Sequence, residues 1–345
     1  MQAKRRPPTL FGYNRSVMLW LHGRVVFICV LLAASLACGG GGPPTEKRLS
    51  IAVIPMGTTH EFWKSIHAGA VKAAGELDVD IIWKGPQVED DRAQQISVVE
   101  DMIARRVDGI VLAPLDRTGL RQVVGEARKS GIPTVVVDSG LEGSEHISFV
   151  ATDNRKGGVL GAQRLVETLD GKGKIILMRV IVGAESTMDR VEGFLSEIRK
   201  HPGIEILSDN QYGGVTTETA YQVGENLLNR FPDVDGIFCP NESTTFGMLR
   251  ALTDSGKSGQ VKFVGFDSSE KLITALADGR LQGLVLQNPF RMGELGIKTM
   301  VGYLRDPTQE PTERIDTGVS VATPENMNDA GIAALLRPPI DEYLD

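Results

Sequence analysis

Residues 51–82 read IAVIPMGTTHEFWKSIHAGAVKAAGELDVDII, and the fold of the chain can be worked out from this stretch. The apolar run 51–54 shows no alternation, which is typical of a strand buried on both faces of a parallel sheet. A turn-rich loop follows at 55–61. Apolar residues then recur at helical spacing, at Ile66, Ala70, Val71, Ala74 and Leu77. The stretch therefore predicts a strand–loop–helix unit of an open α/β sheet.

Three ring side chains lie where this loop meets its helix: His60, Phe62 and Trp63. In open α/β sheets, ligands bind beyond the carboxyl ends of the strands. Adjacent helical residues face different directions, so Phe62 and Trp63 cannot both point into the core. A solvated loop residue is an equally good interpretation of His60. We expect this loop to form one wall of a small-molecule cleft.

Length and composition narrow the class of protein. A chain of 345 residues has room for two ordinary domains. Its composition, 41% hydrophobic and 23% charged, is that of a soluble globular protein. The net charge of −7 argues against non-specific binding to nucleic acid, which needs a basic surface.

The N-terminal residues predict export. Arg24 precedes an apolar run at 25–36, which is too short to span a membrane and ends just before Cys38 and four glycines. This pattern resembles a bacterial lipoprotein signal, with Ser35 where Leu is common. We predict a signal peptide at 1–38, lipid on Cys38, a linker at 39–48, and a periplasmic protein anchored to the membrane. A simple anchor helix is the alternative, and either Met1 or Met18 is the start.

Beyond residue 49, strands and helices alternate, which predicts parallel sheets. The expected strands are 51–54, 109–113, 134–137, 147–150, 174–178, 204–207, 236–239, 262–266 and 284–287, with an extended segment at 314–321. The expected helices after the first are 91–105, 118–130, 157–169, 190–200, 217–230, 244–253, 271–278 and 293–304. The predicted fold is α/β, with two similar Rossmann-like lobes and parallel central sheets. Cys239 is alone in the folded part, so no disulfide is expected within one chain.

Polar residues lie at the ends of four of these strands. They are Asp138 and Ser139, Asn241, Asp267 and Gln287, while Arg190 is expected to open a helix. Carboxylate, amide and guanidinium groups together satisfy a polyhydroxylated ligand, and aromatic faces pack on the C–H face of a sugar ring. Four of them have a plainer interpretation: Asp138, Asn241 and Asp267 as helix caps or turn residues, and Arg190 as a surface ion-pair residue.

Motifs for catalysis and metal binding are absent from the sequence. There is no G-x-x-x-x-G-K-[ST], no H-E-x-x-H and no G-x-S-x-G, and the five histidines form no convincing metal set. Asp138 and Asp267 could pose as a carboxylate pair, but an enzyme is the least supported class. We expect no catalytic residue, no cofactor and no metal.

From residue 49 to about 321, the chain resembles the ribose-type periplasmic sugar-binding proteins of ABC importers. The segments that carry the resemblance are IAVIPMGTTHEFWKSIHAGA, GIVLAP, IPTVVVDSG, FVATDNRKGG, DRVEGF, FPDVDGIFCPNE, VKFVGFDSS and VLQNP, in the family's order. The resemblance implies the type I periplasmic-binding fold, in which three crossings join two lobes and a sugar closes the hinge. The crossings would fall near 152–153, 287–288 and 316–318. This places the N-terminal lobe at 49–152 plus 288–317, and the C-terminal lobe and tail at 153–287 plus 318–345.

The resemblance also implies the ligand contacts. They fall on His60, Phe62, Trp63, Asp138, Arg190, Asn241, Asp267 and Gln287. The chain departs from ribose binders at five positions, Met56, His60, Ala113, Ser139 and Val215, which puts ribose itself in doubt. Ser139, which takes the place of the family's Arg, is kept in the predicted site.

The expected function is that of a solute-binding protein, monomeric, that takes a monosaccharide or related polyol and docks on an ABC permease. The alternative is a module that senses a sugar or a sugar-like quorum signal and presents its closed form to a receptor. A transcriptional repressor is disfavoured, because the N-terminal residues form an export signal rather than a helix-turn-helix.

Overall fold

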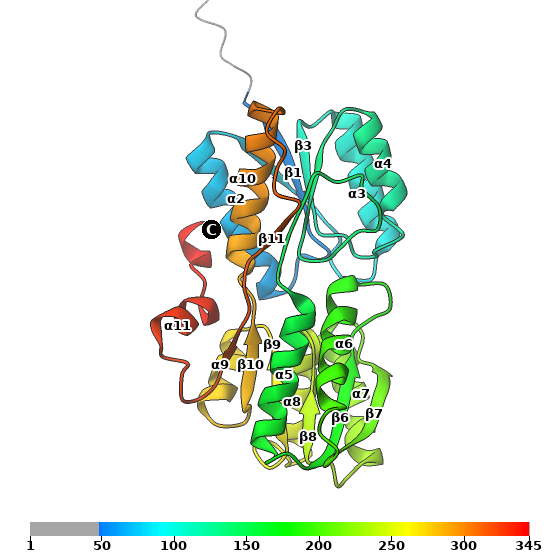
Figure 1. The fold of residues 1–345 in the computed structure, drawn as a ribbon, viewed down its shortest axis with the longest axis vertical. Helices are drawn as coiled ribbons and strands as arrows, with labels where there is room; N and C mark the ends of the chain where they lie inside the picture. The colour runs from blue at the N-terminus through cyan, green and yellow to red at the C-terminus, as the bar shows by residue number, and fades with distance from the viewer. Residues whose placement is uncertain (1–47, 345) are drawn as a thin grey trace, which may run out of the picture. The chain divides into compact units, whose positions relative to one another are not determined.

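The structure is a computed structural model that describes residues 48–344, and the predicted signal peptide, Cys38 and nearly all of the linker lie outside these residues. The described residues form two α/β lobes, each built on a six-stranded sheet (Figure 1). The strands of the first sheet are β1 (Ser50–Ile54), β2 (Asp80–Trp83), β3 (Gly109–Leu112), β4 (Thr134–Val137), β5 (Ser148–Ala151) and β11 (Arg314–Asp316). Those of the second are β6 (Gly173–Arg179), β7 (Ile204–Tyr212), β8 (Gly236–Phe238), β9 (Lys262–Phe266), β10 (Gly283–Leu286) and β12 (Ser320–Ala322).

Helices cover both sheets. They are α2 (Glu61–Leu77), α3 (Arg92–Arg105), α4 (Arg121–Lys129), α5 (Asn154–Thr168), α6 (Glu185–Ile198), α7 (Thr217–Arg230), α8 (Glu242–Asp254), α9 (Glu270–Ala277), α10 (Pro289–Arg305) and α11 (Ala330–Leu336), with a short 3₁₀ helix, η1 (Ile340–Glu342). Among residues 48–344, no helix combines the length and the apolar character that crossing a membrane would require.

The two sheets repeat one topology. The strand orders are β11-β5-β4-β3-β1-β2 and β12-β10-β9-β8-β6-β7, so β4 and β9 occupy the same place in their sheets. All pairings are parallel except that of β12 with β10. Strands β1, β3, β4 and β5 are buried almost along their whole length, as the unbroken apolar runs predicted. Because the two sheets share one strand order, a residue that follows a strand in one lobe has a counterpart after the matching strand in the other lobe.

The chain passes three times from one sheet to the other. It leaves β5 for α5 and β6, leaves β10 for α10 (which packs on α2), and runs from β11 to β12. The lobe boundaries given above stay a prediction. The tail continues past β12 through α11 to η1, which lies against α2 of the N-terminal lobe.

Close helix packing sets the position of Arg190. A Cβ on Gly158 of α5 would lie 1.9 Å from the carbonyl oxygen of Arg190 on α6. A Cβ on Gly193 of α6 would lie 2.0 Å from the carbonyl oxygen of Arg155 on α5. Only glycine allows this approach, and it brings the start of α5 against the Arg190 side chain.

Several predicted boundaries were wrong. Helix α6 begins at Glu185, so Arg190 lies in its second turn rather than opening it. Helix α4 begins at Arg121, because the Asp116 carboxylate accepts hydrogen bonds from the amides of Thr118 and Gly119 and holds them in a turn. Strand β2, helix α11 and η1 had not been assigned from the sequence. Cys239 is a buried free thiol, as expected.

Candidate functional site: the cleft between the lobes

A small cavity lies between the lobes, beyond the carboxyl ends of both sheets. Its volume is about 30 Å³, and eight of the nine predicted binding residues contribute to its wall. These are His60, Phe62, Trp63, Asp138, Arg190, Asn241, Asp267 and Gln287. Its other residues include Met56, Glu89, Glu242 and a hydrophobic edge at Val180, Ile181 and Ala184. Side chains from distant parts of the sequence thus converge here, and we call this cavity the cleft.

Asp138 and Asp267 are the matching anchors of the two lobes. Each follows the strand at the same place in its sheet, β4 or β9. Each has left-handed backbone, with φ 63° at Asp138 and 67° at Asp267. The Asp138 amide donates to the Val150 carbonyl at 3.0 Å, and the Asp267 amide donates to the Val285 carbonyl at 2.8 Å. This backbone conformation is strained for a residue other than glycine, and residues held in it cluster at functional sites.

Two buried acceptor atoms in the cleft have no partner among the described residues. The Gln287 amide donates through Nε2 to Asp267 Oδ1 at 2.7 Å, but its Oε1 accepts nothing. Asp138 Oδ1 is likewise without a hydrogen-bond donor. Buried polar atoms are nearly always satisfied, so these two acceptors mark the place for a ligand that donates hydrogen bonds.

Arg190 balances the charge of the cleft. It is 3% exposed, and its guanidinium donates to Asn154 Oδ1 at 2.8 Å and to the Pro240 carbonyl at 2.9 Å. Its Nη2 lies 3.9 Å from Asp138 Oδ1, beyond hydrogen-bond distance but close enough for charge attraction. The guanidinium also lies over the Phe266 ring, 4.1 Å from its centroid. Arg190 is therefore a buried residue of the site and not a surface ion-pair residue.

Asn241 and Ser139 differ from the other predicted residues. The Asn241 side chain caps α8, since its Oδ1 accepts from the Thr244 amide at 3.0 Å. The plainer interpretation as a helix cap is thus correct for Asn241, although the residue also borders the cleft. Ser139 does not border it. Its hydroxyl accepts from the Ser186 amide of the other lobe at 3.1 Å, which links the lobes beside the cleft.

Trp63 is a core residue that also borders the cleft, and Phe62 is the more exposed of the two rings. Trp63 is 2% exposed and packs among the apolar residues of the N-terminal lobe. Phe62 meets it edge to face, with ring centroids 4.9 Å apart. Both rings border the cleft, and Phe62 also packs against the core cluster that contains Trp63.

Glu89 is a site residue that sequence reasoning missed. Its Oε1 accepts from Trp63 Nε1 at 2.5 Å and lies 2.9 Å from His60 Nδ1. It lies in the loop between β2 and α3, and no local pattern in the sequence marks it. Burial opposes a charge on His60, but the hydrogen bond and charge of Glu89, helped by Glu242 and Asp267, raise its pKa to about 9. His60 is thus a cation held by Glu89, not a solvated loop residue.

Glu242 is the second residue that was missed. It opens α8 of the C-terminal lobe, yet its carboxylate accepts from the Phe62 amide at 3.2 Å and the Glu61 amide at 3.5 Å. It therefore binds the N-terminus of α2 from across the cleft. Burial raises the pKa of Glu242 to about 7, against the attraction of His60. Glu242 also follows β8, but nothing local shows what it faces, so only its neighbour Asn241 was predicted as a site residue.

Acidic groups dominate the cleft. Burial raises the pKa of Asp138 to about 7, Arg190 opposes this rise, and Asp267 adds to it. Burial also raises the pKa of Asp267, again against Arg190. The cleft thus offers many acceptors, suits a neutral ligand with several hydroxyl groups, and repels anions. Among residues 48–344, no group of three or more His, Cys, Asp or Glu side chains could hold a metal ion.

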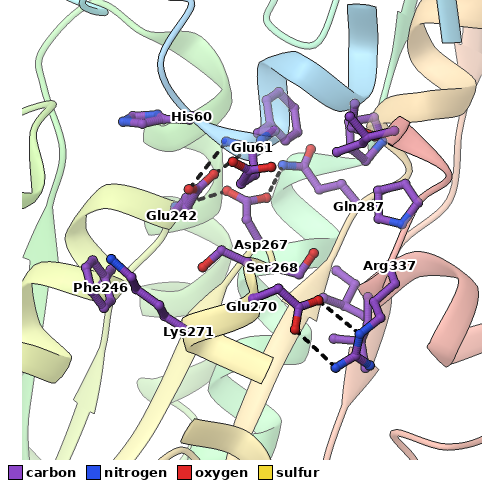
Figure 2. A pocket seen from close by; sticks show the side chains of 18 of the residues that line it. His60, Glu61, Glu242, Phe246, Asp267, Ser268, Glu270, Lys271, Gln287 and Arg337 are labelled. Atoms are coloured by element: carbon purple, nitrogen blue, oxygen red, sulfur yellow. Dashed lines mark hydrogen bonds and ion pairs between the residues drawn. The ribbon is translucent and has the colours of Figure 1, made fainter. Parts of the chain in front are cut away.

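A larger groove opens from one side of the cleft. Its volume is about 720 Å³, and it shares His60, Phe62, Glu242, Asp267 and Gln287 with the cleft. Figure 2 shows Asp267 and Gln287 at its inner end, and Glu270 paired with Arg337 of the tail at its outer edge. We call it the side groove.

Known proteins share this architecture. The periplasmic binding protein domain matches residues 51–308. The chain belongs to the periplasmic binding protein family. This confirms the resemblance seen in the sequence, the two-lobed α/β fold, and the expectation of a binding protein rather than an enzyme. The family name also places such a protein outside the cytoplasm.

Three related proteins show how similar the chain is to individual members of the family. The chain is 29% identical over 290 residues to the D-ribose/D-allose-binding protein of Pseudomonas aeruginosa, covering 81% of this periplasmic binding protein and 90% of the relative. A carbohydrate transporter solute binding protein from Agrobacterium radiobacter, in complex with D-arabinose, has a TM-score of 0.81 and 32% identity, over 85% and 100% of the two chains. An ABC transporter solute binding protein from Agrobacterium vitis, with bound D-fucose, has a TM-score of 0.80 and 34% identity, over 84% and 100%.

Proposed function

We propose that this periplasmic binding protein is the sugar-binding component of an ABC importer. It takes a monosaccharide or a related polyol into the cleft, where the two lobes close on it, and the closed form docks on a membrane permease. The observation that carries the proposal is the pair of unpartnered buried acceptors, Asp138 Oδ1 and Gln287 Oε1, in a cavity walled by both lobes. The sugars named for the related proteins support the same class of ligand.

The contacts of a sugar follow from the groups in the cleft. Hydroxyl groups of the ligand donate to Asp138 and Gln287, and Arg190 donates to a ligand oxygen. Phe62, partly exposed at the wall, packs on the C–H face of the ring. Trp63 acts indirectly by supporting Phe62. Ser139 serves closure of the lobes, through its bond to the Ser186 amide.

Hinge motion is supported by the size of the cleft and by the contacts around it. A cavity of about 30 Å³ has room for one or two waters, whereas ligand sites usually span roughly 300–1,000 Å³. The lobes meet through hydrogen bonds such as Gly140 amide to Glu185, at 2.8 Å, and Phe62 amide to Glu242, at 3.2 Å. A ligand therefore enters after these contacts open, and the lobes then close again around it, leaving more space than the cavity of this structure has.

Titration calorimetry tests the proposal. The purified protein is titrated with pentoses, hexoses, deoxy sugars, alditols and the corresponding uronic acids, and small-angle scattering follows its radius of gyration. We expect binding of at least one neutral sugar or polyol, a smaller radius of gyration in the complex than in the free protein, and no binding of uronic acids. A panel in which nothing binds, or in which only the acids bind, would contradict the proposal.

A further inference from the structure

The side groove is continuous with the cleft. Five residues border both spaces, and Asp267 and Gln287 form the step between them (Figure 2). A ligand anchored on this pair therefore has an open path into a space many times larger than the cleft. The tail, from Leu335 to Asp341, makes the far wall of the groove.

Polar atoms of the groove lack partners within the described residues. Ser65 on α2 borders the groove, is 1% exposed, and its hydroxyl makes no hydrogen bond. Gln287 Oε1, at the inner end of the groove, is also buried without a hydrogen-bond partner. Ser269 also borders the groove, and its side chain makes no capping bond to α9. Two buried unsatisfied groups at one groove need an explanation, and a bound hydroxylated molecule supplies it.

The rest of the wall suits the same kind of occupant. Phe246, Leu335 and Leu336 provide apolar surface, which fits the C–H face of a sugar ring. The two basic groups at the rim are engaged: Arg337 pairs with Glu270 at 3.0 Å, and the Lys271 ammonium lies 4.7 Å from the centroid of the Phe246 ring. Glu242 and Asp267 face the groove as well, so an anionic group is disfavoured.

We propose that the side groove is a second subsite, which holds a further hydroxylated unit joined to the sugar in the cleft. The substrate class is then a glycoside or short oligosaccharide rather than a free monosaccharide alone. This inference rests on the proposed function, because the first unit is held by the cleft. The second unit exchanges hydrogen bonds with Ser65 and Gln287 and packs against the tail.

Calorimetry with matched ligands tests the subsite. Each monosaccharide that binds is compared with its methyl glycoside, its glyceryl glycoside and disaccharides that extend it at each hydroxyl in turn. We expect at least one extended ligand to bind roughly three- to tenfold more tightly than the monosaccharide, as one or two further hydrogen bonds would give. Ser65→Ala should remove a large part of this gain and leave monosaccharide affinity unchanged.

A second variant fills the groove. Ser269→Tyr places a ring in the space without removing a helix cap, so it should abolish the gain for extended ligands while the monosaccharide still binds. If every extended ligand binds no better than its monosaccharide, or if neither variant reduces the gain, the subsite is refuted and the proposed function stands. If no sugar of either kind binds, the proposed function itself fails.

Discussion

Arg190 is the residue on which the charge balance of the cleft depends. It is the buried cation that faces Asp138, and burial already raises the pKa values of Asp138 and Asp267 despite its presence. Its hydrogen bonds to Asn154 and Pro240 hold it in place, so it cannot follow a ligand that leaves. The guanidinium is therefore part of the preformed site.

Arg190→Ala should destabilise the protein and abolish sugar binding. Leaving a buried charge without its partner costs about 3–5 kcal/mol, which urea unfolding at pH 7.5 would measure. Adding Asp138→Asn should restore part of this stability but not binding, because the unpaired charge is gone while the contacts stay lost. Arg155→Ala, which breaks the exposed pair with Glu192, is the control and should cost less than about 1 kcal/mol. An Arg190→Ala protein as stable as the control would contradict this account.

The protonation of His60 depends mainly on Glu89, whose hydrogen bond and charge oppose the effect of burial more than Glu242 and Asp267 do. Its ordinary pKa of 6.5 is raised to about 9 against the effect of burial. For a base whose pKa is raised in the folded state, the added stability is complete below 6.5 and is lost as the pH rises through about 9.

Glu89→Gln should move the pKa of His60 from about 9 back toward 6.5. The amide keeps an acceptor for Trp63 or His60 but removes the charge that favours the imidazolium. An NMR titration of the ring protons, assigned with a His60→Gln protein, gives the pKa. The control is Glu61→Gln, since Glu61 pairs with Lys64 and not with His60. An unchanged pKa in Glu89→Gln would show that another group holds the proton.

At the scale of elements, the N-termini of helices shape the cleft. Helix α2 has no side-chain cap of its own at His60, and its first amides are bound by Glu242 from the other lobe. Helix α8 is capped by Asn241. A residue of the C-terminal lobe thus caps a helix of the N-terminal lobe, and the same contact holds the two lobes together.

Glu242→Gln should flatten the dependence of stability on pH. The pKa of Glu242 is raised from 4.5 to about 7, so the unfolded chain loses this proton first and stability falls as the pH rises from 4.5 to about 7. Glutamine keeps an acceptor for the Phe62 amide and cannot ionise. Between pH 5 and 8, the wild-type protein should lose on the order of 2–3 kcal/mol more than the variant.

Urea unfolding across this pH range measures the difference. Glu218→Gln is the matched control, because Glu218 also lies in the first turn of its helix, α7, but is exposed and pairs with Arg250. The control should follow the wild-type curve. Parallel curves for Glu242→Gln and wild type would mean that folding does not raise the pKa of Glu242.

Asn241→Ala separates capping from binding. Loss of a cap costs about 1 kcal/mol, and Asp91→Ala, which removes the cap of α3, should cost the same. Only Asn241→Ala should also weaken sugar binding, by roughly tenfold if one hydrogen bond to the ligand is lost. Asn241→Ser keeps a capping oxygen, so it should recover stability without recovering affinity. Equal affinity in all three proteins would leave Asn241 as a cap alone.

At the scale of the whole molecule, the tail spans both lobes. Leu336 is buried in the C-terminal lobe and Arg337 pairs with Glu270 of α9. Further on, η1 lies against α2, and the Tyr343 ring lies 5.6 Å from that of Phe290 at the start of α10. Figure 1 shows this tail in red beside the three crossings. Separation of the lobes must therefore bend or release it.

Removing residues 338–345 should open the ligand-free protein further. The deletion takes η1 and Tyr343 away and leaves Leu336 in its core, so the fold is kept while one restraint between the lobes is lost. Small-angle scattering should show a larger radius of gyration for the free truncated protein, and the same value as wild type once sugar is bound. Identical scattering of the two free proteins would show that the tail does not restrain opening.

The sequence by itself determined the repeated α/β plan and most of the cleft. Unbroken apolar runs, as at 51–54 and 134–137, show which strands are buried on both faces, because successive side chains of a strand point to opposite faces of the sheet. Residues just after such strands lie at the carboxyl edge of their sheet, as Asp138 does in one lobe and Asp267 in the other. Helix starts were harder, as Arg190 shows, since a cap depends on the surrounding loop.

Only the tertiary structure decided what these residues face. Glu89 and Glu242 have no local pattern, yet they hold His60 charged and bind the end of α2, because folding brings them there from other elements. Asn241 proved to be a cap as well as a cleft residue, and Ser139 a link between lobes. The unpartnered Ser65 and the side groove depend on where the tail packs. Charge, desolvation and cavity shape arise from distances between remote segments, and those distances are a property of the folded chain.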